Sequence, residues 1–239
     1  ELVAISEDPV AEFQEALALA RSFGVPDDRI VRIDQPGRFH RSLARLANID
    51  PGRRREIGYR AIRHNLFHRG QYAYCMVLAA ETALRMGLKS VTAIEFGVLY
   101  GAGLLNMCEI ADFIEQTLGV SFRVVGFDTG QGLPDVADYR DHPELWASGT
   151  LAMPNYDELR AALPANAELI IGDIANTLDG LVATLTRDAP VGFVAVDVDQ
   201  YHSTLSSLRI FDAAPEKLLP VIPVWVDDSY LSVLQSVWA

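Results

Sequence analysis

Cysteine is scarce in this sequence. Only Cys75 and Cys108 occur among its 239 residues, so neither a disulfide-rich scaffold nor a zinc site with the usual Cys and His spacing is present. Each cysteine lies in an apolar stretch, which predicts a buried free thiol in a reducing compartment. We therefore expect a cytoplasmic protein.

The sequence also lacks an excess of basic residues and long apolar runs. Lys and Arg number 20 against 32 Asp and Glu, for a formal net charge of -12. An acidic protein repels phosphate backbones, which argues against nucleic acid as a partner. No apolar run reaches the roughly 18–20 residues that span a bilayer, and no signal peptide is visible. We expect no membrane association, and a small molecule or another protein as partner.

From residue 90 onward, short apolar stretches rich in β-branched residues alternate with helix-like stretches. This alternation is typical of βαβ units and predicts a Rossmann-like, doubly wound α/β fold, a mostly parallel sheet with helices on both faces. The expected strands are 91–96, 122–127, 167–171, 192–197 and 221–227. The expected helices are 102–118, 156–163, 175–187 and 203–213. Ligands of such sheets bind at the carboxyl ends of the strands, where site residues are expected.

The first part of the chain has a different pattern. Residues 8–23 and 71–87 have the apolar spacing of helices, and residues 24–40 are rich in Gly, Pro and Asp and predict a loop. We expect a helical N-terminal extension over residues 1–88 that covers the site or forms a dimer. A catalytic domain over residues 89–239 would follow it.

A glycine-rich turn follows the first expected strand. Gly97, Gly101 and Gly103 stand between this strand and a helix, where glycine lets the backbone approach a ligand. Their spacing is not the G-x-G-x-x-G of dinucleotide enzymes. Glu95 ends the strand and would repel a pyrophosphate, whereas it suits S-adenosylmethionine with its ammonium and sulfonium groups. The alternative is a tight turn that binds no ligand.

Aspartates end the second and third strands. Asp128 lies where nucleoside sites have a carboxylate that accepts hydrogen bonds from two ribose hydroxyls. The sequence Asp-Thr-Gly is also typical of a turn, so Asp128 could instead only stabilise a turn. Asp173 could accept a hydrogen bond from an adenine amino group or cap the helix that begins near residue 175. Both interpretations of each aspartate stay open.

A cluster of aspartates follows the fourth and fifth strands. Asp197 and Asp199 are two residues apart and would face one side, and Asp227 and Asp228 end the next strand. Neighbouring strand ends would bring these carboxylates together, which raises their pKa values unless a cation such as Mg²⁺ neutralises them. A metal would activate a substrate hydroxyl, and a remaining carboxylate or His202 would accept the proton. The alternative is that each aspartate caps a helix or decorates a loop.

These strand-end motifs occur together in one known family. They are Glu95-Phe96-Gly97-Val98 with Gly101 and Gly103, Gly126-Phe127-Asp128-Thr129, Gly172-Asp173, Asp197-Val198-Asp199-Gln200-Tyr201 through Ser203-Thr204, and Asp227-Asp228. Over about residues 90–228 the chain resembles class I S-adenosylmethionine-dependent methyltransferases of the macrocin O-methyltransferase type. The resemblance implies Mg²⁺-assisted methylation of a hydroxyl on a sugar or another small natural product.

The resemblance also implies roles for individual residues. Glu95 and Gly97 would hold the methionine part of the cofactor, Asp128 the ribose, and Asp173 would lie by the adenine. The full expected cofactor site is Glu95, Phe96, Gly97, Gly101, Gly103, Asp128, Thr129, Gly172, Asp173 and Ile174. The expected metal ligands are Asp197, Asp227 and Asp228. The expected catalytic residues are Asp199, the preferred base, and His202.

The chain departs from the family pattern in three places. Val198 stands where the family more often has Gly, and His202 where it often has Glu, which affects the identity of the base. Residues 132–146 look like a substrate-dependent lid. Only eleven residues follow Asp228, where the fold normally adds a hairpin, so the end is either shortened or missing. An open pocket, or one completed by a second subunit in a homo-oligomer, would follow.

Other functions remain as alternatives. One is a metal-independent methyltransferase that acts on nitrogen or a carboxylate, which chelators would not inhibit. Another is a catalytically degenerate methyltransferase-like protein that binds the cofactor without turnover. A nicotinamide dehydrogenase is disfavoured by the glycine spacing.

Overall fold

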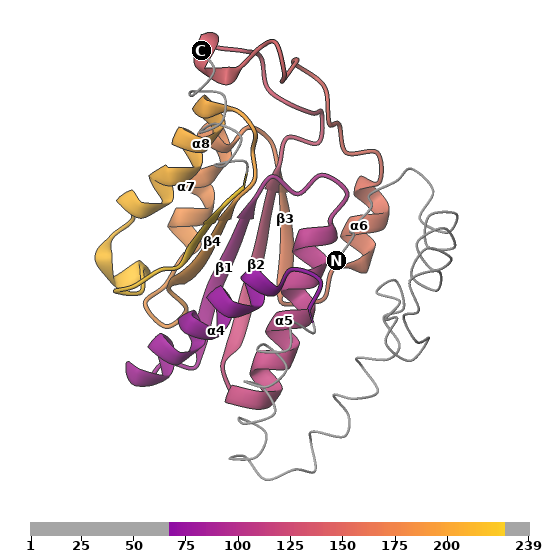
Figure 1. Cartoon of the computed structure of the whole chain (residues 1–239). Helices are drawn as coiled ribbons and strands as arrows, with labels where there is room; N and C mark the ends of the chain where they lie inside the picture. Colours follow the sequence, from indigo (N-terminus) through magenta and orange to yellow (C-terminus); the bar gives the residue numbers. More distant parts are fainter. Residues whose placement is uncertain (1–66, 228–239) are drawn as a thin grey trace, which may run out of the picture. The chain divides into compact units, whose positions relative to one another are not determined.

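The computed structural model describes residues 67–227, which form a parallel sheet with helices packed against it (Figure 1). The strands are β1 (Ser90–Phe96), β2 (Ser121–Asp128), β3 (Ala167–Ile171), β4 (Val191–Val196) and β5 (Val224–Val226). The α-helices are α4 (Gly70–Arg85), α5 (Ala102–Leu118), α6 (Tyr156–Ala162), α7 (Ile174–Thr184) and α8 (Tyr201–Leu208). Short 3-10 helices are η2 (Tyr139–Asp141), η3 (Arg209–Asp212) and η4 (Pro215–Lys217).

The strand order is β3-β2-β1-β4-β5, and every neighbouring pair is parallel. The chain runs outward from β1 to β3 and then returns to the other side of β1 with β4. This reversal leaves a crevice beyond the carboxyl ends of β1 and β4, the usual ligand position in such sheets. The predicted doubly wound α/β fold and the predicted adjacency of the fourth and fifth strands are confirmed.

The two faces of the sheet are covered by different helices. On one face α4 contacts β1 and β4, and α5 contacts β2 and β1 (Figure 1). On the other face, buried side chains of α7 such as Leu178 and Leu181 pack with Ile94 and Phe96 of β1. Successive residues of a strand point to opposite faces, so Glu95 points toward α4 and α5, away from that cluster.

Most predicted elements match the structure within two or three residues, and the helix 102–118 and the strand 167–171 match fully. The predicted helix 203–213 is wrong at its end, because α8 ends at Leu208 and the 3-10 helix η3 follows it. The last strand is shorter than predicted because Pro223, just before Val224, has no N–H to give to a ladder. The predicted helix 8–23 and loop 24–40 lie outside the described residues. Among residues 67–227, no helix combines the length and apolar character needed to cross a membrane.

Candidate functional site

A pocket with a cavity volume of about 250 Å³ opens beyond the carboxyl ends of the central strands. Its wall combines the glycine-rich turn, the ends of β2 and β4, and part of the segment 132–146 that was expected to form a lid. The predicted site residues that line it are Gly97, Asp128, Thr129, Asp173, Ile174, Asp197 and Asp199. The described ones that do not line it are Glu95, Phe96, Gly101, Gly103, Gly172, His202 and Asp227.

The turn after β1 is held by Asp128. Its Oδ2 accepts hydrogen bonds from the backbone N–H groups of Val98 and Leu99 at 3.1 and 2.9 Å, and its Oδ1 accepts one from Gly130 at 2.7 Å. The expected turn chemistry of this aspartate is therefore present. Its contact with a ribose stays a prediction, for which its place in the pocket wall is suitable.

Glu95 lies beside the pocket rather than in its wall. Its side chain is 1% exposed, and its Oε1 accepts a hydrogen bond of 3.0 Å from the hydroxyl of Tyr72. Its Oε2 is buried and accepts no hydrogen bond from the described protein atoms. Burial raises the pKa of Glu95 from 4.5 to about 8. The predicted role of Glu95 toward the methionine part stays a prediction, but Arg69 rather than Glu95 faces the pocket.

We expect Glu95→Gln to stabilise the fold at alkaline pH. The wild-type carboxyl keeps its proton in the folded state up to about pH 8 but loses it near pH 4.5 when unfolded. The unfolded state therefore binds fewer protons in this window, and wild-type stability falls as pH rises, by up to about 1.4 kcal/mol per pH unit. The neutral amide has no such slope, so its advantage should reach the order of 4 kcal/mol above pH 8.

Urea denaturation at pH 5 and pH 8.5 measures this difference, with the exposed Glu158→Gln as a matched control. The control should leave the pH dependence unchanged. Equal pH slopes in wild type and Glu95→Gln would contradict a neutral buried Glu95.

Arg69 is a pocket residue that sequence reasoning missed. Its Nη1 donates to the hydroxyl of Tyr72 at 2.8 Å and to Oδ2 of Asp197 at 3.4 Å, and lies 3.9 Å from Oε1 of Glu95. Its backbone N–H donates to Oδ1 of Asn106 at 3.0 Å. The partner carboxylates lie in β1 and after β4, so no local pattern around Arg69 signals these contacts.

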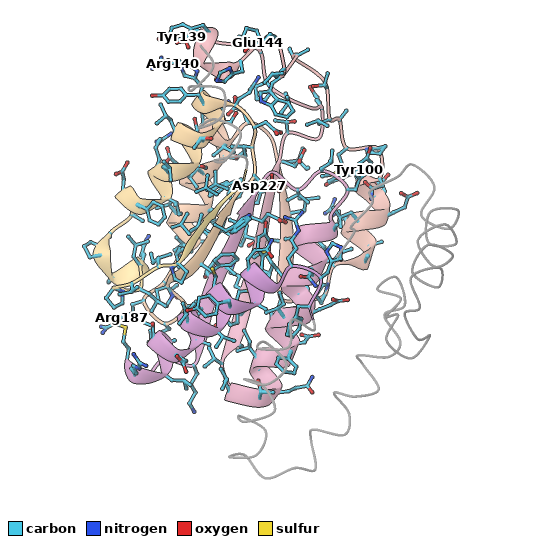
Figure 2. The ribbon with its side chains drawn as sticks, in the orientation of Figure 1. Tyr100, Tyr139, Arg140, Glu144, Arg187 and Asp227 are labelled. Carbon is cyan, nitrogen blue, oxygen red and sulfur yellow. The ribbon has the colours of Figure 1, made fainter. Side chains whose placement is uncertain are left out.

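Asp197 and Asp227 come together as predicted from neighbouring strand ends. The backbone N–H of Asp227 donates to the carbonyl of Val196 at 2.9 Å, and Figure 2 shows Asp227 near the ends of the strands. Burial first, and then the charge of Asp227, raise the pKa of Asp197 to about 6. Two carboxyl groups in this arrangement are suitable donors for a hard cation.

The third predicted metal ligand, Asp228, lies outside the described residues. Within the described range, no group of three or more His, Cys, Asp and Glu side chains is arranged to hold a metal ion. The guanidinium of Arg69 already supplies one positive charge to Asp197. The metal site therefore stays a prediction.

Asp173 caps α7, one of its two predicted roles. Its Oδ1 accepts a hydrogen bond of 2.8 Å from the backbone N–H of Ala175. It also lines the pocket, so a contact with adenine remains a prediction. Phe96 packs in the core against Phe127, with ring centroids 4.9 Å apart, and Gly101 is the N-cap of α5.

The two predicted catalytic residues lie in different surroundings. Asp199 lines the pocket and has a φ of 58°, in the left-handed region. His202 does not line it. Its Nδ1 lies 3.0 Å from both carboxylate oxygens of Asp141, and its backbone N–H donates to Asp141 Oδ1 at 2.9 Å.

Asp141 thus anchors the segment 132–146 to α8. Its side chain is 1% exposed, and its Oδ2 accepts a hydrogen bond of 2.8 Å from the backbone N–H of Ala137. Burial alone would raise the pKa of Asp141, but the hydrogen bonds from His202 and Ala137 lower it. Figure 2 shows Arg140 of this segment beyond the strand ends. The segment contributes Leu133 and Pro134 to the pocket wall, as a lid would.

Comparison with protein-family models found no match, and no curated protein matches the chain significantly. Among solved structures, the chain is similar to the calicheamicin methyltransferase CalS11, at 20% identity and a TM-score of 0.45, over 89% of this chain and 80% of that chain. It is also similar to the O-methyltransferase NovP, at 20% identity and a TM-score of 0.48, over 67% of this chain and 64% of that chain.

A second structure of CalS11, described as a TDP-rhamnose 3'-O-methyltransferase, matches at 20% identity and a TM-score of 0.33, over 81% of this chain and 79% of that chain.

Proposed function

We propose that this chain is an S-adenosylmethionine-dependent methyltransferase that methylates a hydroxyl oxygen of a small molecule. The observation that carries the proposal is the charge of the pocket at the reversal point of the sheet. The described wall holds four carboxyl groups and one guanidinium, contributed by Asp128, Asp173, Asp197, Asp199 and Arg69. Such a wall favours a cationic cofactor over one with a pyrophosphate.

The reaction requires in-line attack of the acceptor oxygen on the sulfonium methyl group. An O–C bond forms as the S–C bond breaks, and the sulfur takes the bonding pair and leaves as the thioether of S-adenosylhomocysteine. The acceptor hydroxyl loses its proton, which Asp199 accepts in the pocket wall and then releases to solvent. The lid segment excludes water from the reacting groups when it is held by Asp141.

We also propose that Asp197, Asp227 and Asp228 would hold Mg²⁺. The support is the approach of Asp197 and Asp227: burial first, and then the charge of Asp227, raise the pKa of Asp197. When bound there, the ion would lower the pKa of the acceptor hydroxyl. The roles of Asp199 and of the cofactor pocket do not depend on it.

Titration calorimetry with S-adenosylhomocysteine and NAD tests the proposed cofactor. We expect binding of the adenosyl thioether and little or none of NAD, because the carboxyl groups of the wall repel a pyrophosphate. Tight NAD binding without binding of S-adenosylhomocysteine would overturn the proposal.

We expect Asp227→Asn to weaken Mg²⁺ binding by about tenfold or more, because it removes one charged oxygen ligand. Calorimetric titration of the protein with MgCl₂ measures this, and the exposed Asp188→Asn serves as a control that removes the same charge elsewhere. Methylation that is insensitive to EDTA, together with equal Mg²⁺ affinity in both variants, would favour a metal-independent methyltransferase.

A further inference from the structure

Arg69 is the basic side chain in the described pocket wall, which otherwise carries only carboxyl groups among its charged members. Any anionic group of a ligand therefore meets repulsion along most of this wall. The guanidinium is the one described side chain that would attract it. A polar ligand with a single carboxylate would therefore bind with that carboxylate toward Arg69 and away from the carboxyl groups of the wall.

The guanidinium of Arg69 is held in place from one side. Its described bonds, to Tyr72 and Asp197, both use Nη1, and the group lies 5.0 Å from the centre of the Tyr72 ring. Nε and Nη2 donate to no other described residue. The side chain is 25% exposed and lines the pocket. Two parallel N–H groups of a guanidinium match the two oxygens of a carboxylate.

The position of Arg69 along the pocket indicates which end of a ligand it meets. The strand order places Asp173 and Asp128, after β3 and β2, toward one end of the pocket. Asp197, which Arg69 contacts, follows β4 on the other side of β1. An adenosine group at the first end would therefore extend its amino-acid group past Gly97 toward Arg69.

We propose that Arg69 binds the α-carboxylate of the amino-acid part of the cofactor. This inference rests on the proposed function, because that carboxylate is the one anionic group of S-adenosylmethionine. Tyr72 and Asp197 position the guanidinium. Asp197 thereby acts on the cofactor through Arg69, besides its predicted role toward a metal.

Three ligands that share the adenosine group and differ at the sulfur and the amino-acid end test the proposal by calorimetry on the full chain. S-adenosylmethionine has the carboxylate, decarboxylated S-adenosylmethionine lacks it but keeps the sulfonium charge, and 5′-methylthioadenosine lacks the whole amino-acid group and is an uncharged thioether. We expect wild type to bind the first ligand about 10–100-fold more tightly than the second, the range for hydrogen bonds between charged groups. Arg69→Gln should lose this difference and bind 5′-methylthioadenosine as wild type does.

Arg85→Gln is the matched control, since Arg85 lies on the same helix with a side chain that is 79% exposed. It should leave all three affinities unchanged. Arg69→Lys keeps the charge and loses the paired N–H groups, so it should retain part of the difference. It provides the same test if Arg69→Gln does not fold.

Two results would contradict the inference in distinguishable ways. Equal weakening of all three ligands in the folded Arg69 variants would show that Arg69 only supports the pocket, which overturns the inference and leaves the proposed function standing. Failure of wild type to bind any of the three ligands would overturn the proposed function itself.

Discussion

Replacing Asp199 by asparagine should slow methyl transfer by about 10²–10⁴-fold, the range for loss of a general base. The substitution changes only the proton-accepting group, because asparagine, like aspartate, tolerates the left-handed backbone that Asp199 adopts with a φ of 58°. Geometry is then preserved while the proton acceptor is removed. Labelled S-adenosylmethionine with the best acceptor from a panel of hydroxylated small molecules measures the rate, and cofactor affinity should change little.

His202→Gln separates the two predicted bases. His202 is bound to Asp141 and does not line the pocket, so its loss should act through the lid and raise the KM of the acceptor more than it lowers kcat. A loss of kcat in His202→Gln as large as that expected for Asp199→Asn, with Asp199→Asn near wild type, would identify His202 as the base instead.

Gly97→Ala should destabilise the fold by about 5 kcal/mol or more, or prevent folding, since it combines backbone strain with a clash. Gly97 has a φ of 85°, and a Cβ atom added there would lie 1.6 Å from the backbone carbonyl oxygen of Asp197. The oxygen belongs to the main chain after β4 and cannot rotate away. Relief of the clash requires separation of the ends of β1 and β4, which form the pocket floor.

Gly119→Ala is the control for the backbone conformation alone. Gly119 ends α5 with a φ of 74°, and an added Cβ atom there would meet nothing within 4 Å. Gly119→Ala should lower the free energy of unfolding by about 1–2 kcal/mol, the energy that a left-handed conformation costs a residue with a Cβ atom. Urea denaturation compares the two variants. Similar losses in both would mean that the strand ends separate easily, contrary to the packing seen here.

The sequence predicted those parts of the structure that depend on local patterns. The apolar stretches located β1 to β4, and the alternation of strands and helices predicted the parallel sheet and the approach of Asp197 and Asp227. The capping of α7 by Asp173 follows from a short-range rule and was one of two roles considered. These features involve either neighbouring residues or strands whose order the fold class restricts.

The contacts that sequence reasoning missed all join distant segments. Arg69 precedes the sheet, and its role depends on how α4 packs across β1 and β4. Asp141 is one of four acidic residues in the segment 132–146, and only the folded chain brings it to His202. Helix and strand periodicity carries no information about such side-chain pairs. The position of Glu95 outside the pocket wall has the same origin, because Arg69, and not Glu95, lines the pocket.

The contact between Arg69 and Asp197 spans 128 residues of sequence, and this separation has a kinetic consequence. The pocket exists only after the first described helix has docked beside the fourth strand, so partly folded chains lack it. We therefore expect a ligand that recognises the assembled pocket to bind only the folded chain. It should slow global unfolding and leave the refolding rate unchanged. The bound ligand would stabilise the folded state by RT ln(1 + [L]/Kd). This stabilisation would protect amides throughout the sheet from hydrogen exchange, and not only the amides around the pocket.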